Sequence, residues 1–205
     1  MSNRDTLVVR TMVSTPGRVG SGNVPPSRVL ALLLLTCATA RPPSAGAAGP
    51  SEYEVKAAFL YNFARFVEWP LDVPGADGTF VVTVLGRDPF RSALDDTLRG
   101  KTIDGKRVVV RRVSHSEDVG HSHIVFISDS ETDRLPAILK SLDAAPVLTV
   151  GDMSQFAERG GVIGFKVDQE RIRLEINVAA AQRSRLRISS QLLKLARIVD
   201  AGTGS

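Results

Sequence analysis

The chain has 205 residues, of which 43% are hydrophobic and 23% are charged, a composition typical of globular proteins and unlike that of disordered ones. Its formal net charge of +4 suggests a polyanion-binding protein. However, residues 1–47 hold five of the 26 basic side chains and only one of the 22 acidic ones, so the rest of the chain has 21 of each. The bulk charge therefore gives no support to a nucleic-acid-binding face.

Residues 1–47 predict an export signal. The segment 29–40, VLALLLLTCATA, is apolar, follows a basic residue and precedes the small residues AGAA. These features are typical of a secretory signal peptide, and the apolar run is shorter than the roughly 20 residues that span a membrane. We expect cleavage after Ala47, with Ala40 as the second choice, and a periplasmic mature protein. An uncleaved membrane anchor and lipidation at Cys37 are the alternatives.

Cysteine usage narrows the chemistry of the exported protein. Cys37 is the only cysteine and lies within the predicted leader. The mature chain is therefore expected to have no disulfide, no thiol nucleophile and no cysteine metal site.

We expect the chain to divide into a signal peptide (1–47), a flexible lead-in (48–51), a single α/β domain (52–199) and a C-terminal tail (200–205).

An aromatic-rich segment opens the predicted domain. The stretch EYEVKAAFLYNFARFVEWP at 52–70 has Phe59, Phe63 and Phe66 at i, i+4 and i+7, which is one face of an α-helix. Proline cannot continue a helix and disfavours helical geometry in the residue before it, so Pro70 predicts a helix end near Trp69. We expect the three phenylalanines to point toward the sheet.

The segments that follow alternate between strand and helix patterns. Runs rich in β-branched residues predict buried strands at residues 80–85, 107–113, 123–128 and 146–150. Helices are predicted at residues 90–98, 135–142 and 154–158. The first of these helices has Asp88 as its predicted N-cap and Pro89 at its first position.

The last part of the chain has a different pattern. Apolar residues alternate on both sides of a turn at 168–170, which predicts a β-hairpin over 163–176, and residues 178–199 predict a closing helix with Asn177 as its N-cap. Strand–helix alternation followed by a hairpin predicts a three-layer α/β sandwich. Its mostly parallel sheet of five to six strands would have helices on both faces and a C-terminal antiparallel hairpin.

Catalytic motifs are absent from the sequence. The chain has no GxGxxG, GxxxxGK[ST] or GxSxG pattern. His121 and His123 could both face one side of an extended segment, as metal ligands do, but no third ligand stands at a recognisable spacing, and exposed loop histidines are the favoured interpretation. We therefore expect a protein that is not an enzyme and has no cofactor or metal.

Several polar or glycine residues follow the predicted parallel strands. In open α/β sheets, ligands gather at the carboxyl ends of such strands. A soluble module that binds a small envelope ligand is therefore one possible function, with candidate residues Gly86, Asp88, Asp129 and Asp152.

Five segments, in order along the chain, together resemble a known family. They are EYEVKAAFLYNFARFVEWP at 52–70, VLGRDPF at 84–90, PVLTVGD at 146–152, GGVIGF at 160–165 and LEINVAAAQRSRLRISSQLLKLA at 174–196. These segments are similar to those of the YfiR-like family of exported proteins and span essentially the whole predicted mature chain.

The resemblance implies a periplasmic α/β domain without known enzymatic activity, often dimeric. The best-understood relative restrains a membrane-bound diguanylate cyclase by binding its periplasmic part, which controls cyclic-di-GMP and biofilm formation. Related domains also serve as sensory modules of membrane signalling proteins. This chain has Ser122 where the family often has a cysteine, so redox control through a disulfide is not expected here.

The leading expectation is therefore a regulator that docks on an inner-membrane signalling protein. An apolar stripe on the closing helix and two aromatic residues near the first helix are the candidate contacts. They are Leu186, Ile188, Leu192 and Leu195, with Tyr61 and Trp69. For Leu192 and Leu195, burial in the core is the favoured alternative, because a stripe at helical spacing is usually buried.

Overall fold

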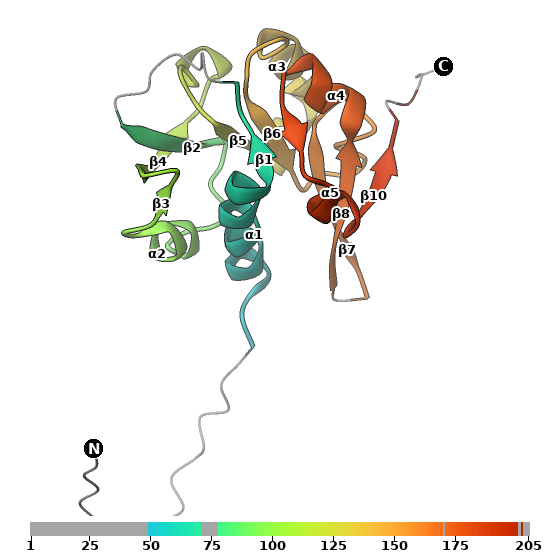
Figure 1. Ribbon diagram of the computed structural model, residues 1–205. Coiled ribbons are helices and arrows are strands. Elements are labelled where there is room, and N and C mark those ends of the chain that lie inside the picture. The colour runs from blue at the N-terminus through green and yellow to red at the C-terminus, as the bar shows by residue number, and fades with distance from the viewer. Residues whose placement is uncertain (1–48, 71–77, 170, 201, 203–205) are drawn as a thin grey trace, which may run out of the picture. The chain divides into compact units, whose positions relative to one another are not determined.

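The computed structural model describes residues 49–70, 78–169, 171–200 and 202 (Figure 1). The predicted signal peptide, the first residue of the lead-in and most of the predicted C-terminal tail lie outside these residues. Among the described residues, no helix has both the length and the apolar character needed to cross a bilayer.

The first helix, α1 (Glu52–Phe66), begins at a capping box. The Glu54 N–H donates to the Ser51 hydroxyl at 3.3 Å, and the Ser51 N–H donates to the Glu54 carboxylate at 2.6 Å. The helix ends three residues before the predicted position. The Phe66 carbonyl accepts from the Ser189 N–H at 2.9 Å, and the next two residues pair with a distant strand, so a tertiary contact ends the helix before Pro70 does.

A mostly parallel eight-stranded sheet forms the centre of the protein, in the order β10-β8-β7-β6-β5-β2-β4-β3 (Figure 1). Its strands are β2 (Thr79–Leu85), β3 (Thr102–Ile103), β4 (Lys106–Val113), β5 (Ile124–Ile127), β6 (Leu148–Gly151), β7 (Ile163–Asp168), β8 (Arg171–Asn177) and β10 (Ala196–Val199). Only the β3–β4 and β7–β8 pairs are antiparallel. The α/β sandwich and its hairpin are confirmed, with two short edge strands added to the predicted number.

Helices cover both faces of the sheet. One buried cluster joins α1, α2 (Ala93–Leu98), α4 (Val178–Arg183) and α5 (Ser190–Leu193) to one face. The other cluster joins α3 (Leu135–Ser141) and the loop after β6 to the opposite face. Residues of β5 alternate between the clusters, since Phe126 belongs to the first and Ile127 to the second, as the two-residue period of a strand requires.

The predicted closing helix over 178–199 is wrong. In its place lie α4, the two-residue strand β9 (Arg187–Ile188), α5 and β10. The helix cannot continue through Arg185, which has a φ of +56°, a left-handed conformation that helices do not contain. The Ser189 hydroxyl then caps α5 by accepting from the Leu192 N–H at 3.3 Å. Strand β9 pairs with β1 (Val67–Glu68), and β10 pairs with β8.

Three shorter predictions are also corrected. Helix α2 begins at Ala93 and not at Phe90, because Arg91 has a φ of +55°, which helices do not contain. The Asp88 carboxylate, which accepts from the Phe90 N–H at 2.8 Å, therefore caps only a turn. A 3₁₀ helix (Asp129–Arg134) precedes α3. Residues 154–158 form turns and no helix.

The aromatic stripe of α1 is rotated from the predicted direction. Phe63 is fully buried, whereas Phe59 and Phe66 are half-buried at the margin of the same cluster. The face that points to the sheet holds Ala57, Leu60 and, unexpectedly, Lys56.

Candidate functional site

A buried charged cluster lies where α1 meets the carboxyl end of β6. Lys56 has only 2% of its side chain exposed, and its ammonium lies 2.7 Å from Asp152 Oδ2 and 2.5 Å from Glu52 Oε1. The Tyr53 hydroxyl donates to the same Asp152 oxygen at 3.0 Å. Two residues of the helix therefore hold a carboxylate that follows strand β6.

Aromatic rings surround the Lys56 ammonium. It lies 4.4 Å from the centroid of the Tyr53 ring and 5.9 Å from that of Phe165, within the range of cation–π attraction. The Tyr53 ring also packs edge-on against Phe90, with the centroids 5.4 Å apart. The ammonium is thus enclosed by two carboxylates and two rings, which compensates a charge that would otherwise be costly to bury.

The Tyr53 hydroxyl is strongly held in its protonated state. Burial, followed by the negative charge of Asp152, raises its pKa well above the ordinary value, and Asp129 contributes in the same direction. Asp129 and Asp152 follow the neighbouring strands β5 and β6, so two of the three predicted strand-end carboxylates act on Tyr53. The hydroxyl can serve as a hydrogen-bond donor but not as a base at neutral pH.

Asp152 also borders a hollow of about 550 Å³, which Glu158, Glu175 and Arg197 line as well. Its Oδ1 atom is buried and has no hydrogen-bond partner among the described residues. A buried carboxylate oxygen without a donor is unusual, because such groups are normally satisfied by protein or by water.

The two other predicted loop residues have structural contacts. Gly86 has a φ of +92°, and a Cβ there would lie 2.6 Å from the Ser130 hydroxyl and 2.7 Å from Glu131 Oε1. These two side chains therefore fill the space between the ends of β2 and β5. The Asp88 carboxylate caps its own turn and accepts from Arg112 Nε at 2.6 Å, which ties the turn to β4.

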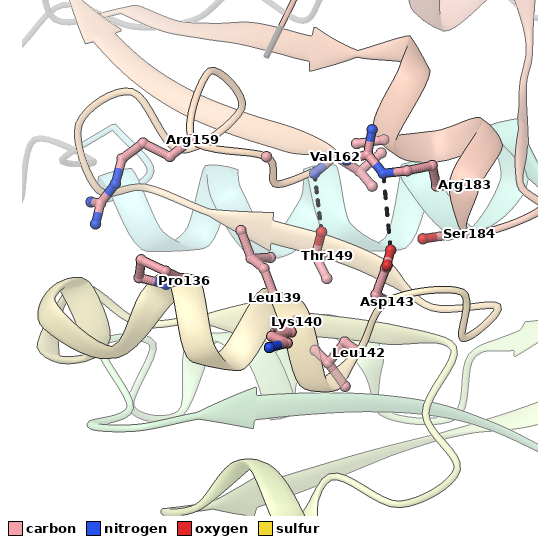
Figure 2. Close-up of a pocket in the computed structure, with 12 residues that line it drawn as sticks. Pro136, Leu139, Lys140, Leu142, Asp143, Thr149, Arg159, Val162, Arg183 and Ser184 are labelled. Carbon is pink, nitrogen blue, oxygen red and sulfur yellow. Dashed lines mark hydrogen bonds and ion pairs between the residues drawn. The ribbon is translucent and has the colours of Figure 1, made fainter. Parts of the chain in front are cut away.

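A second hollow, of about 350 Å³, lies between α3 and α4 (Figure 2). Arg183 points toward Asp143, with Nε 3.9 Å from Oδ1, and the Val162 N–H donates to the Thr149 hydroxyl at 3.0 Å. Lys140 and Arg159 also line it. None of the residues predicted from sequence lies in this hollow, and its charges are mixed.

The predicted docking residues are in different environments. Leu186 and Leu192 are buried in the main core, with 3% and 4% of their surface exposed. Ile188 is half-buried and pairs with Val67 in the β1–β9 ladder. Leu195 is 74% exposed, so the alternative of core burial is correct for Leu192 and wrong for Leu195.

The two aromatic docking candidates are half-buried. The Trp69 Nε1–H donates to the His123 carbonyl at 3.2 Å, and its ring packs edge-on against Phe80. Tyr61 packs at the margin of the core, with the Lys101 ammonium 5.6 Å from its ring centroid. Both side chains therefore pack against the domain's own core, and only part of each is exposed for contact with a partner.

Large exposed apolar side chains occur at one end of the sheet. Among the described residues they are Val167 in β7, Leu195 just before β10 and Ile198 in β10. Strand β10 is an edge strand, so its outer side has no neighbouring strand in the described part of the chain. Apolar groups at an open sheet edge mark a surface suited to association.

His123 is buried, contrary to the expectation of an exposed loop histidine. Its ring stacks on Phe80 with the centroids 4.3 Å apart, and its Nδ1 accepts from the Val81 N–H at 3.2 Å. Burial, together with the positive charge of Lys106, lowers the pKa of His123 to about 4. No group of three or more potential metal-ligating side chains is found within the described ranges.

Sequence reasoning missed Lys56, and it did not connect Tyr53 with Asp152. Lys56 lies at i, i+4 and i+7 with Leu60 and Phe63, so it occupies the buried stripe of α1. A lysine in such a stripe is a signal that a buried counter-charge exists elsewhere. The sequence could therefore have identified Lys56, although not its partner Asp152, which lies 96 residues away.

A family model described as YfiR/HmsC-like matches residues 53–197 of the chain. The chain therefore belongs to the YfiR/HmsC-like family. This family is regulatory and non-catalytic, and membership supports a role as a periplasmic regulator that acts with a membrane signalling protein.

Solved structures resemble the fold at low sequence identity. A conserved domain protein from Vibrio cholerae has a TM-score of 0.51 and 13% identity, over 72% of this chain and 60% of that one. The ABC domain in complex with L-Trp from Streptococcus pneumonia has a TM-score of 0.44 and 12% identity, over 60% and 56%. A substrate-binding protein with adhesive properties from Clostridium difficile has a TM-score of 0.44 and 11% identity, over 70% of this chain and 58% of that one. The chain thus spans less than two thirds of each, and the likeness concerns the fold alone.

Proposed function

We propose that this protein is an exported, non-enzymatic regulator that binds the periplasmic part of an inner-membrane diguanylate cyclase and restrains it. Family membership over residues 53–197 is the observation that carries the proposal. The leader-like pattern of residues 1–47 supports export, which would bring the protein to the periplasmic side of its partner. Control of cyclic-di-GMP, and with it biofilm formation, would follow.

The exposed apolar groups of the sheet end supply a docking surface for this proposal. Val167, Leu195 and Ile198 are 52%, 74% and 49% exposed, and all three lie at or beside the β7–β8–β10 side of the sheet. A regulator acts on a receptor by binding one of its conformations more tightly than the other, which shifts the receptor population toward that conformation. Burial of these side chains against the inactive cyclase would supply the required difference in affinity.

The proposal is tested in the native organism by deletion of the gene. Cyclic-di-GMP and biofilm mass should rise in the deletion strain. The full-length gene should restore both, whereas a gene that begins at residue 48, and so lacks the leader, should not. Unchanged cyclic-di-GMP in the deletion strain would contradict the proposal, and rescue by the leaderless gene would contradict its periplasmic site of action.

We also propose that the regulator forms a homodimer, as the family resemblance implies. The purified mature protein should sediment as a dimer at micromolar concentration. A monomer at micromolar concentration would contradict the homodimer, and the regulator would then bind the cyclase as a single copy.

A second candidate function is a periplasmic module that binds a small ligand. The hollow bordered by Asp152 favours it, since the hollow lies at the carboxyl end of β6, where ligands of open α/β sheets bind. Of the four strand-end residues, only Asp152 lines this hollow, and its charge and that of Asp129 both act on the nearby Tyr53.

A thermal-shift screen of metabolites with wild-type protein and Asp152→Asn separates the two functions. Stabilisation of the wild type alone would favour ligand binding. No stabilisation by any metabolite, together with co-purification of a membrane cyclase, would favour the regulator.

A further inference from the structure

The edge of the sheet has a step beside the β7–β8 hairpin. Strand β7 pairs with β8 along its whole length, from Arg171 to Ile176. Strand β10 pairs with β8 only from Leu174 onward, beginning at Ala196. Arg171, Ile172 and Arg173 therefore have a strand on one side and, within the described part of the chain, none on the other. The hairpin projects past the start of β10 (Figure 1).

A hollow of about 510 Å³ lies at this step, and we name it the β8-edge hollow. Its apolar lining comes from Leu174, Leu195 and Ala196. Leu195 is 74% exposed, and Val167, which pairs with Ile172, is 52% exposed. Three open residues of a strand span roughly 10 Å, enough for a short extended segment to form backbone hydrogen bonds in line with β10.

Positive charge is in excess around the β8-edge hollow. Four basic side chains line it against two acidic ones, Asp168 and Glu175. Glu175 is shared by Arg197 at 2.9 Å and Lys166 at 3.7 Å, and Asp168 lies 3.9 Å from Arg173.

Two cations have no partner in the described part of the chain: Lys194 in the lining of the hollow, and Arg171 on the open segment of β8 beside it. Lys194, in the hollow, has no ion pair or hydrogen bond from its ammonium among the described residues, and the guanidinium of the exposed Arg171 has none either. An occupant that lies along this edge would meet uncompensated positive charge, so an acidic one is favoured.

We propose that the β8-edge hollow binds an extended, acidic segment of the membrane partner, which adds to the free edge of β8 and places an apolar side chain against Leu195. This inference rests on the proposed function and specifies the partner segment. A second copy of the chain is a poor occupant, because it would bring its own Lys194 and Arg171 against the same excess of positive charge. A lipid surface would use the charge but not the open backbone groups of β8.

The first test uses the full mature protein and synthetic peptides followed by fluorescence anisotropy. The probe is a labelled heptapeptide of alternating glutamate and valine. It should bind the wild type, whereas the matched lysine–valine peptide should not. Binding of the acidic peptide should weaken about tenfold in Lys194→Glu combined with Arg171→Glu, and should be unchanged in the control Lys140→Glu on α3.

Strand addition is tested with a modified peptide, so that the protein stays intact. Methylation of alternate peptide nitrogens on the acidic probe removes backbone donors from one edge and should abolish binding. Equal binding by the methylated peptide would overturn strand addition. Equal binding by the lysine–valine peptide would overturn the charge argument.

The partner is tested in cells by a photo-crosslinking amino acid at position 195, with position 140 as the control. Position 195 should crosslink to an acidic, extended segment of a membrane cyclase, identified by mass spectrometry of the linked peptide. A cyclase that co-purifies with wild type but crosslinks only at position 140, or binds Lys194→Glu normally, would overturn this inference and leave the proposed function intact. Absence of any cyclase from the wild-type complex would overturn both.

Two further outcomes would identify another occupant. Binding of the protein to phosphatidylglycerol vesicles, lost in Lys194→Glu and without peptide binding, would make the hollow a lipid contact. A change from dimer to monomer in sedimentation of the same variant would make it an interface between copies of this chain.

Discussion

Lys56 and Lys194 carry the same charge in opposite surroundings. The side chain of Lys56 is 2% exposed and contacts two carboxylates, whereas Lys194 is exposed at the β8-edge hollow and has no partner for its ammonium in the described part of the chain. A buried charge is tolerated only when the fold supplies a counter-charge, while an exposed one stays solvated and available. The first lysine is therefore expected to matter for folding, and the second for binding.

The largest effect that separates the two lysines is expected for Lys56→Ala. This change leaves the Asp152 carboxylate, whose side chain is 7% exposed, without its cation, so the free energy of unfolding should fall by about 3–5 kcal/mol. Urea unfolding of the mature protein measures it.

Lys194→Ala is the matched control for Lys56→Ala and should unfold like the wild type. The double variant Lys56→Met with Asp152→Asn should recover part of the loss, since it removes both charges. Equal losses for Lys56→Ala and Lys194→Ala would show that the buried pair contributes nothing special.

The apolar side chains permit a parallel comparison between Leu186 and Leu195. Leu186→Ala removes buried methyl groups from the core and should lower the free energy of unfolding by about 2–5 kcal/mol. Leu195→Ala removes a side chain that is 74% exposed and should change it by less than about 0.5 kcal/mol. Thermal or urea unfolding measures both. A large loss for Leu195→Ala would contradict its assignment as a free docking residue.

Burial also sets the pH dependence of stability through His123. Its pKa is about 4 in the folded protein and near 6.5 when exposed, so the unfolded chain takes up a proton that the folded one does not. The contribution of His123 to the free energy of unfolding is therefore fully present above pH 6.5. It falls by about 3 kcal/mol as the pH drops toward 4. Urea unfolding at half-unit steps of pH measures the slope.

His123→Asn is the matched variant for this titration. Asparagine keeps an acceptor for the Val81 N–H but does not titrate, so its stability should vary less between pH 6.5 and 4. The same slope in both proteins would assign the pH dependence to other groups.

The sequence predicts best where local pattern and tertiary environment agree. The uninterrupted apolar runs of β2 and β5 can be stable only as buried strands, and both lie where the pattern predicts them. The family segments also made the α/β class predictable. The capping box of Ser51 and Glu54 is local, and the start of α1 follows from it.

Prediction fails where long-range pairing decides. Residues 178–199 have apolar positions compatible with a helix, yet the left-handed Arg185 and the pairing of β9 with β1 and β10 with β8 divide them into four short elements. The docking stripe predicted on this helix, Leu186, Ile188, Leu192 and Leu195, is therefore spread over several elements and does not form one face. Of its residues only Leu195 is exposed, because its position depends on the start of an edge strand that the sequence pattern does not reveal.

The smallest expected effect on stability belongs to Lys194→Glu. Because Lys194 is exposed and its ammonium has no partner within the described ranges, reversal of its charge should change the free energy of unfolding by less than about 0.5 kcal/mol. The melting temperature of the mature protein should therefore match that of the wild type. Because Lys194→Glu is expected to leave the fold stable, a loss of partner binding in this variant can be assigned to the changed surface and not to unfolding. If Lys194→Glu instead destabilised the protein as much as Lys56→Ala is expected to do, Lys194 would be a structural residue, and its assignment as a binding residue would be wrong.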